Sequence, residues 1–234
     1  QFLDPELRGL FATIGIEKGK PFAPDERMKK ILEQSAKLGN ATVRALFWYE
    51  RNKSEFLYKG SYWKRGMIGN SHEYLKDQGL GGRNIDARAQ YFYMATFNSP
   101  AMVWKLIGRG SQYAWGYLDS NGKYLDGGNS YKLNLPANAP AEKFMSIVVY
   151  DSQTRSMLQT SQPYPNKNNK RDKLLVNKDG SIDIIFGPKA PNGKEANWIE
   201  TRPNKGWFCL LRLYSPTEAW FDKTWRPGEI ELLN

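Results

Sequence analysis

The sequence predicts a mostly β protein of the α+β class, with an antiparallel β-sandwich or jelly-roll-like core and N-terminal helices. Apolar residues recur at three- and four-residue intervals near the N-terminus and alternate with a period of two beyond about residue 101. The chain has 21 Gly and 13 Pro, and many of them separate the alternating runs. We therefore expect a helical segment over residues 1–100, packed on the core, and a β-sandwich domain of residues 101–234.

Three segments are expected to be helical: 4–15, 23–50 and 84–97. The first begins with Asp4 as N-cap and Pro5 at the first helical position, and it ends at Gly15. The second carries apolar residues at helical spacing through Phe47. Asp86 is expected to cap the third. All three lie in the N-terminal segment.

Six alternating runs are expected to be strands: 113–117, 131–135, 144–150, 181–186, 207–214 and 229–232. The run from Phe208 to Leu211 is apolar throughout, which marks a central strand. Cys209 within it is expected to be a buried small hydrophobe. The stretch from Asp119 to Gly122 resembles the opening of a calcium loop but lacks the terminal glutamate, so it is expected to be a turn.

The composition excludes several classes of protein. One cysteine and one histidine exclude an internal disulfide, multi-histidine zinc sites and HExxH proteases. No apolar run approaches the roughly 20 residues that cross a bilayer, and no signal-peptide core is present. The net charge of +10 predicts attraction to anions. No nucleic-acid-binding motif accompanies the densest basic cluster, residues 167–173, which is expected to be a solvated loop. No metal ion, cofactor or nucleic-acid partner is predicted.

A run of ordered motifs in the sequence resembles a known family. Residues 177–188 read NKDGSIDIIFGP, and they are followed by NWI at 197–199, GWF at 206–208, LRLY at 211–214 and FDKTWRPG at 221–228. Upstream, VYD at 149–151, LDG at 125–127 and GKPFAPD at 19–25 fit the same pattern. The chain resembles the C-terminal, 1214-type part of the bacterial two-part family of unknown function numbered 1254 and 1214.

The resemblance implies a β-sandwich core with helical decoration and a bacterial source. It also implies a periplasmic or secreted location, which a processed chain beginning at Gln1 would suit, with a cytoplasmic location as the alternative. Family members carry a further N-terminal, 1254-type unit, which we expect as a partner. The chain is then either the C-terminal portion of a longer precursor or a shortened member. The resemblance implies no settled reaction.

Arg212 is the first candidate for a ligand-binding residue. Strand alternation places it on the face opposite Leu211 and Leu213. A charge there must face a polar cleft, a carboxylate partner or solvent, because burial without a partner is costly. Tyr214 shares its face.

Further candidates lie at strand ends, at a helix start or on aromatic surface, where a rigid scaffold presents functional groups. The expected ligand-binding residues are Arg212, Tyr214, Arg155, Arg88, Trp198 and Trp225, and the candidates for proton transfer are Tyr150, Asp151 and Asp86. A buried Arg212–Asp pair that fixes sheet packing is the competing structural interpretation for Arg212.

Three hypotheses for function follow. The preferred one is binding of a small or oligomeric anionic ligand in an aromatic and Arg-lined cleft, which the 14% aromatic content and the basic charge favour. The second is a carbohydrate-active hydrolase or lyase that works without histidine. The third is an oligomeric or partner-binding module, such as a homo-oligomer that uses the helical first fifty residues as its interface.

Overall fold

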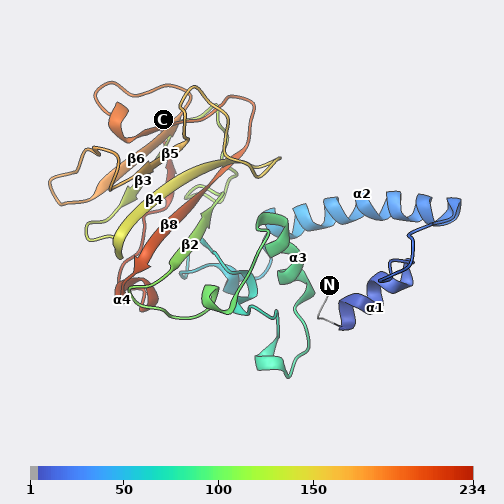
Figure 1. Cartoon of the computed structure of the whole chain (residues 1–234). Coiled ribbons are helices and arrows are strands. Elements are labelled where there is room, and N and C mark those ends of the chain that lie inside the picture. The colour runs from blue at the N-terminus through green and yellow to red at the C-terminus, as the bar shows by residue number, and fades with distance from the viewer. Residues whose placement is uncertain (1–4, 234) are drawn as a thin grey trace. The chain divides into compact units, whose positions relative to one another are not determined.

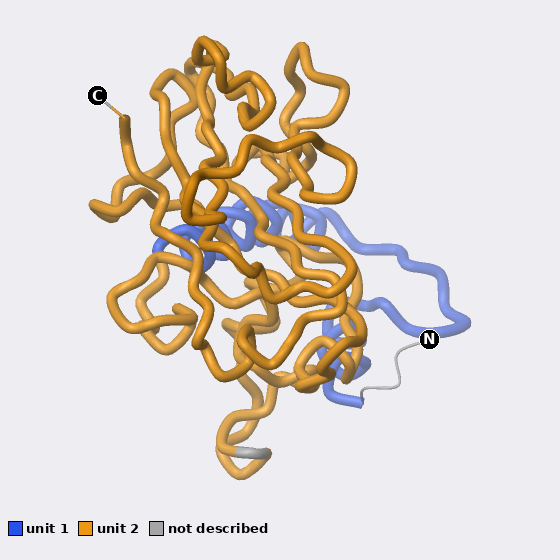
Figure 2. The backbone as a smooth tube through the Cα atoms, turned by 90° about the vertical axis from the view of Figure 1, so that its left-hand side faces the viewer, with its two compact units in different colours: residues 1–49 blue, residues 50–234 orange. Residues whose placement is uncertain are grey.

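The computed structural model describes residues 5–233, with the side chain of Gln78 left out. The chain forms two compact units, residues 1–49 and 50–234 (Figure 2). The expected boundary between residues 100 and 101 stays a prediction. Of the helices that the structure describes, none combines the length and hydropathy of a membrane span.

The first unit is helical, as predicted. It contains α1 (Pro5–Thr13) and α2 (Glu26–Trp48). Asp25 caps α2, since its Oδ1 accepts a hydrogen bond from the Met28 backbone N–H at 2.7 Å. The predicted cap of the first helix, Asp4, lies outside the described residues.

The second unit is α+β, which confirms the predicted fold class (Figure 1). Its described strands are β1 (Lys64–Arg65), β2 (Ser111–Gly116), β3 (Tyr131–Leu135), β4 (Ala141–Asp151), β5 (Asn166–Asn168), β6 (Ile182–Gly187), β7 (Trp198–Glu200), β8 (Trp207–Pro216) and β9 (Ile230–Leu232). Its α-helices are α3 (Ile85–Met94) and α4 (Glu218–Phe221). Short 3-10 turns occur at Lys53–Glu55, Ile68–Asn70, Asp77–Gly79, Pro100–Met102 and Glu195–Asn197.

The strands form two sheets, with orders β1-β2-β8-β4-β5 and β7-β6-β3-β9. All pairs are antiparallel except β6 with β7. A single cluster of buried apolar side chains joins residues of both sheets, among them Ile147, Leu211, Leu133 and Phe186. Burying each such side chain fully contributes about 1.5–3 kcal/mol, so this shared core stabilises the sandwich.

All six predicted strands are confirmed to within three residues at each end. The sequence reading missed β1, β5 and β7, which are two or three residues long. Runs this short show a period only where the flanking residues extend the alternation, as Glu229 does for β9. β5 overlaps the basic cluster that was expected to be a solvated loop, because it pairs with the edge of β4.

The N-cap residue of α3 differs from the prediction. The Asn84 side chain caps the helix by accepting a hydrogen bond from the Ala87 N–H at 3.1 Å, and Asp86 is an exposed residue of the first turn. The helix is linked to β1 by the buried ammonium group of Lys64. Its Nζ lies 2.7 Å from Gln90 Oε1 and 2.6 Å from Glu50 Oε2. This buried polar link holds α3 beside the edge of the five-stranded sheet.

Candidate functional site

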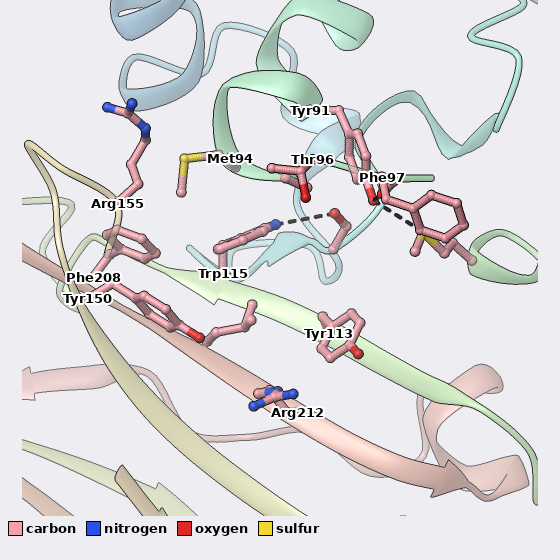
Figure 3. Close-up of a pocket in the computed structure, with 14 residues that line it drawn as sticks. Tyr91, Met94, Thr96, Phe97, Tyr113, Trp115, Tyr150, Arg155, Phe208 and Arg212 are labelled. Carbon is pink, nitrogen blue, oxygen red and sulfur yellow. Dashed lines mark hydrogen bonds between the residues drawn. The ribbon is translucent and has the colours of Figure 1, made fainter. Parts of the chain in front are cut away.

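The outer face of the five-stranded sheet, which points away from the shared core, carries a cavity of about 400 Å³ (Figure 3). Its floor comes from β2, β8 and the end of β4, and its other side from α3 and the segment that follows. We call it the Arg212 cavity. It lies wholly within residues 66–212 of the second unit.

Strand register builds the floor. Arg212 on β8 stands between Tyr113 on β2 and Ser146 on β4. One step along the sheet on this face, Leu210 pairs with Trp115, and then Phe208 pairs with Tyr150. Directly paired residues point to the same face, so these side chains form adjacent rows on one surface.

The Arg212 guanidinium has no carboxylate partner. Its Nη2 donates to the Tyr214 hydroxyl, and its Cζ lies 5.2 Å from the centre of that ring and 5.8 Å from the ring of Tyr113. No described carboxylate lies within ion-pairing distance. The buried Nε atom of Arg212 and the buried Oγ of Ser146, its cross-strand neighbour, have no hydrogen-bond partner among the residues that the structure describes. Unsatisfied buried donors are costly, and a ligand that accepts from them would recover part of that cost.

Arg155 reaches the same cavity from a different element, the turn after β4. Its backbone is held at a φ of 64°, and its N–H donates to the Asp151 carbonyl at 2.8 Å. The guanidinium donates to the Gln153 carbonyl at 2.8 Å and lies 4.2 Å over the ring of Tyr93 on α3. Figure 3 shows Arg155 near Tyr150 and Phe208 at one end of the cavity and Arg212 at the other end.

The lining combines two positive charges with aromatic and aliphatic surface and contains no Asp or Glu. Tyr150 stacks on Phe208 with ring centres 5.2 Å apart, and Trp115 lies 5.8 Å from Phe208. Opposite them, the Tyr91 hydroxyl donates to the Phe97 carbonyl at 2.8 Å, which secures the segment after α3. The cavity is therefore a cationic pocket with flat apolar walls.

Tyr150 and Tyr214 on this face are hydrogen-bond donors at neutral pH. Burial raises the pKa of Tyr150, and the nearby Arg212 charge only partly offsets the rise. Burial likewise raises the pKa of Tyr214, again against the effect of Arg212. Both phenols therefore stay protonated, and neither is poised to act as a base.

Of the residues expected from the sequence, Arg212, Arg155 and Tyr150 come together in the Arg212 cavity. Tyr214 lies beside Arg212 as its hydrogen-bond partner without lining the cavity. It stacks on Phe144 with ring centres 4.2 Å apart.

The other expected residues lie elsewhere. Trp198 is on β7 of the four-stranded sheet, and its Nε1 donates to the Gly187 carbonyl at 2.9 Å. Trp225 is buried in the shared core. Arg88 and Asp86 are on α3 but do not line the cavity.

Asp151 has a structural role. Its carboxylate accepts from Lys205 Nζ at 2.6 Å and from the Gln153 and Thr154 N–H groups at 2.7 and 3.3 Å. Burial raises the pKa of this carboxyl, but these three donors lower it more, and the net pKa lies below its usual value. The negative charge of Asp151 therefore orders the turn that carries Arg155.

Sequence reasoning missed Tyr113, Trp115 and Phe208 as site residues. Period-two alternation put Tyr113 and Trp115 on one face of a strand, but no local signal told which face the core takes. Within the described residues, no three or more His, Cys, Asp or Glu side chains gather to hold a metal ion. Cys209 is fully buried, which confirms its predicted place in the core.

Residues 110–218 match the family described as "Protein of unknown function (DUF1214)". This DUF1214 segment contains β2 to β8, and so it holds Arg212, Arg155 and the aromatic floor of the cavity. The match confirms the 1214-type part of the resemblance over these residues. The 1254-type partner unit stays a prediction. No curated protein matches the chain.

Two solved structures resemble the chain. The VPA0106 protein from Vibrio parahaemolyticus is similar with a TM-score of 0.51 and 18% identity, over 98% of this chain and 51% of that one. An uncharacterised protein from Burkholderia cenocepacia matches with a TM-score of 0.40 and 15% identity, over 97% of this chain and 48% of that one. The chain spans about half the length of each. The first likeness concerns the fold alone.

Proposed function

We propose that this protein binds a small organic anion, a carboxylate attached to a sugar or other flat ring, in the Arg212 cavity. One observation carries the proposal: two guanidinium groups line a pocket that contains no Asp or Glu. Buried or half-buried arginines are normally paired within a protein. A pocket that leaves two of them without a carboxylate favours an anion from outside.

The chemistry of the walls favours a carboxylate on a flat body. A guanidinium matches the two oxygens of a carboxylate with parallel hydrogen bonds. The protonated hydroxyl of Tyr150, which lines the same cavity, supplies a further donor. Tyr113 and Tyr150, which are only partly buried, offer the ring surface on which a sugar packs.

The proposal is binding without turnover. Since no carboxylate or histidine lines the cavity and burial raises the pKa of Tyr150, the candidate base predicted there is not set to take a proton. The hydrolase and lyase hypotheses therefore rank second. Incubation with uronate oligosaccharides, followed by ultraviolet absorbance of unsaturated products and by a reducing-sugar assay, tests for turnover.

The decisive experiment is calorimetric titration of galacturonate into the wild-type protein and into Arg212→Ala. Loss of a charged hydrogen-bond donor costs about 1.5–3 kcal/mol, so we expect affinity to fall roughly ten- to hundredfold. Arg88→Ala is the matched control, because it removes the same charge from a residue of α3 outside the cavity. It should leave affinity unchanged.

Thermal denaturation separates binding from packing. Arg212 makes no ion pair with any carboxylate that the structure describes, so Arg212→Ala should melt near the wild-type temperature. Cooperative unfolding at a much lower temperature would assign Arg212 to sheet packing. Equal loss of affinity in both arginine variants would place the anion elsewhere.

A further inference from the structure

The Arg212 cavity is the first of three adjoining cavities. A smaller cavity of about 190 Å³ shares Gly66, Met102 and Tyr113 with the Arg212 cavity. That smaller cavity in turn shares Leu57, Tyr58, Arg65 and Lys223 with another of about 590 Å³. We call these two the middle and the distal cavity. Shared lining residues place the three hollows next to one another in a series along the β1 edge of the sheet.

The whole series is cationic. Arg155 and Arg212 line the Arg212 cavity, and Lys105 lines the middle cavity. Lys53 and Lys59 line the distal cavity. No Asp or Glu is among the residues that line any of the three. A surface lined by cationic side chains over three adjoining hollows attracts an extended anion better than a single small one.

The charges at the distal end are available to a ligand. Arg65 is paired with Glu55 at 3.4 Å, and Lys105 is paired with Glu218. Lys53, Lys59 and Lys223 are exposed, and none forms an ion pair with a carboxylate in the described part of the chain. The net charge of the series therefore survives its internal pairing.

The distal cavity offers polar groups more than open ring faces. Lys53 Nζ lies 5.6 Å from the centre of the Phe56 ring, and the Arg226 guanidinium lies 5.2 Å from that of Tyr58. The edge of Tyr62 meets Phe56 at 6.2 Å. One face of Phe56 and one face of Tyr58 are thus occupied, while ammonium groups line the hollow.

We propose that the three cavities are consecutive subsites for a linear acidic oligosaccharide, with a terminal uronate carboxylate on Arg212 and later carboxylates beside Lys223, Lys53 and Lys59. This rests on the proposed function and adds the length and chemistry of the ligand. Sugar hydroxyls suit the exposed ammonium groups of Lys53 and Lys59, which donate to neutral oxygens as well as to carboxylates. A single-stranded nucleic acid would need open aromatic faces for its bases along the whole path.

The experiment compares galacturonate with its tetramer and hexamer by calorimetry at constant ionic strength. Contacts made in series raise affinity, so the hexamer should bind on the order of tenfold more tightly than the monomer or better. Lys53→Ala combined with Lys59→Ala should weaken hexamer binding about fivefold to twentyfold, since each exposed ion pair contributes modestly. Monomer affinity should not change in this variant.

Lys178→Ala combined with Lys189→Ala is the control. Both lysines are exposed and lie outside the three cavities, so this variant loses the same charge without touching the path. It should bind the hexamer like the wild type. Equal weakening by the two double variants would reduce the effect to net charge and overturn the proposal.

Two further outcomes overturn it as well. Equal affinity for monomer and hexamer, with monomer binding still dependent on Arg212, would end the subsite series and leave the proposed function intact. Tighter binding of an oligothymidylate of equal charge would make the path a nucleic-acid groove. Monomer binding that ignores Arg212→Ala would instead remove the proposed function itself.

Discussion

The two faces of the five-stranded sheet are built from the same strands yet differ in nearly every property. On β8, Cys209, Leu211 and Leu213 point into the shared core and are fully buried. Between them, Leu210 and Arg212 point to the outer face, where the cavity lies. Alternate residues of one strand therefore serve two purposes. The inner residues hold the sandwich together, and the outer ones are free to carry charge.

Charged binding groups can therefore be placed on the outer face at low cost to the stability of the fold. A guanidinium in the inner face would lose its hydration against aliphatic neighbours. On the outer face the row Tyr113–Arg212–Ser146 tolerates it, because the cavity leaves room for a ligand or water. Rigid pairing across β2, β8 and β4 then holds the row in place.

The largest effect expected from this comparison is on the inner face. Leu211→Ala should lower the free energy of unfolding by about 2–5 kcal/mol, since Leu211 is fully buried in the shared core. Leu210→Ala removes the same atoms from the outer face, where the side chain already borders a cavity, and should cost about 1–2 kcal/mol. Urea denaturation of both variants measures the difference. An equal or greater loss at Leu210 would abolish the distinction between the faces.

A smaller effect is expected at Asp151, the last residue of β4. Asp151→Asn removes the ion pair with Lys205 and should cost about 1–2 kcal/mol of unfolding free energy at neutral pH. Galacturonate binding should weaken slightly, because Asp151 orders the turn that carries Arg155.

The same variant gives a pH test. The pKa of Asp151 is lowered in the folded protein, so the folded state binds fewer protons than the unfolded chain. Its stabilisation is complete above the unfolded pKa of about 3.9 and is lost as the pH falls through the folded value. The gap in stability between wild type and Asp151→Asn should therefore shrink in acid. A gap that stays constant from neutral pH down to strong acid would refute this account.

The smallest effect is expected from a single atom on the outer face. Tyr150→Phe keeps the stack on Phe208 and removes only the hydroxyl. Affinity for galacturonate should fall by about 0.5–1.5 kcal/mol, or roughly two- to tenfold, with no change in melting temperature. Unchanged affinity would show that the phenol does not contact the carboxylate, and a lower melting temperature would give it a packing role.

The elements of this fold were predictable wherever a run is long enough to show its period. The six strands with clear alternation and the three α-helices of the first hundred residues lie where the pattern puts them. β1, β5 and β7 were not predicted, because their own two or three residues are too few to show a period. Each is recognised as a strand only by its pairing with an adjacent strand.

The site was partly predictable for a similar reason. Alternation alone separated Arg212 from Leu211 and Leu213. Trp225 and Trp198 lie outside the Arg212 cavity, since an aromatic residue near a turn serves the core as readily as a surface. The indole of Trp225 ended in the shared core, and that of Trp198 bonded to a neighbouring strand.

By itself, the sequence determined which residues share one side of a strand or helix, because that depends on the local geometry of a few successive peptides. Only the tertiary structure decided that Tyr150, Arg155 and Arg212 line one hollow and that Asp151 is paired with Lys205. Those outcomes depend on pairing between segments far apart in the chain. Burial and charge acquire their energetic meaning only from the neighbours that such pairing supplies.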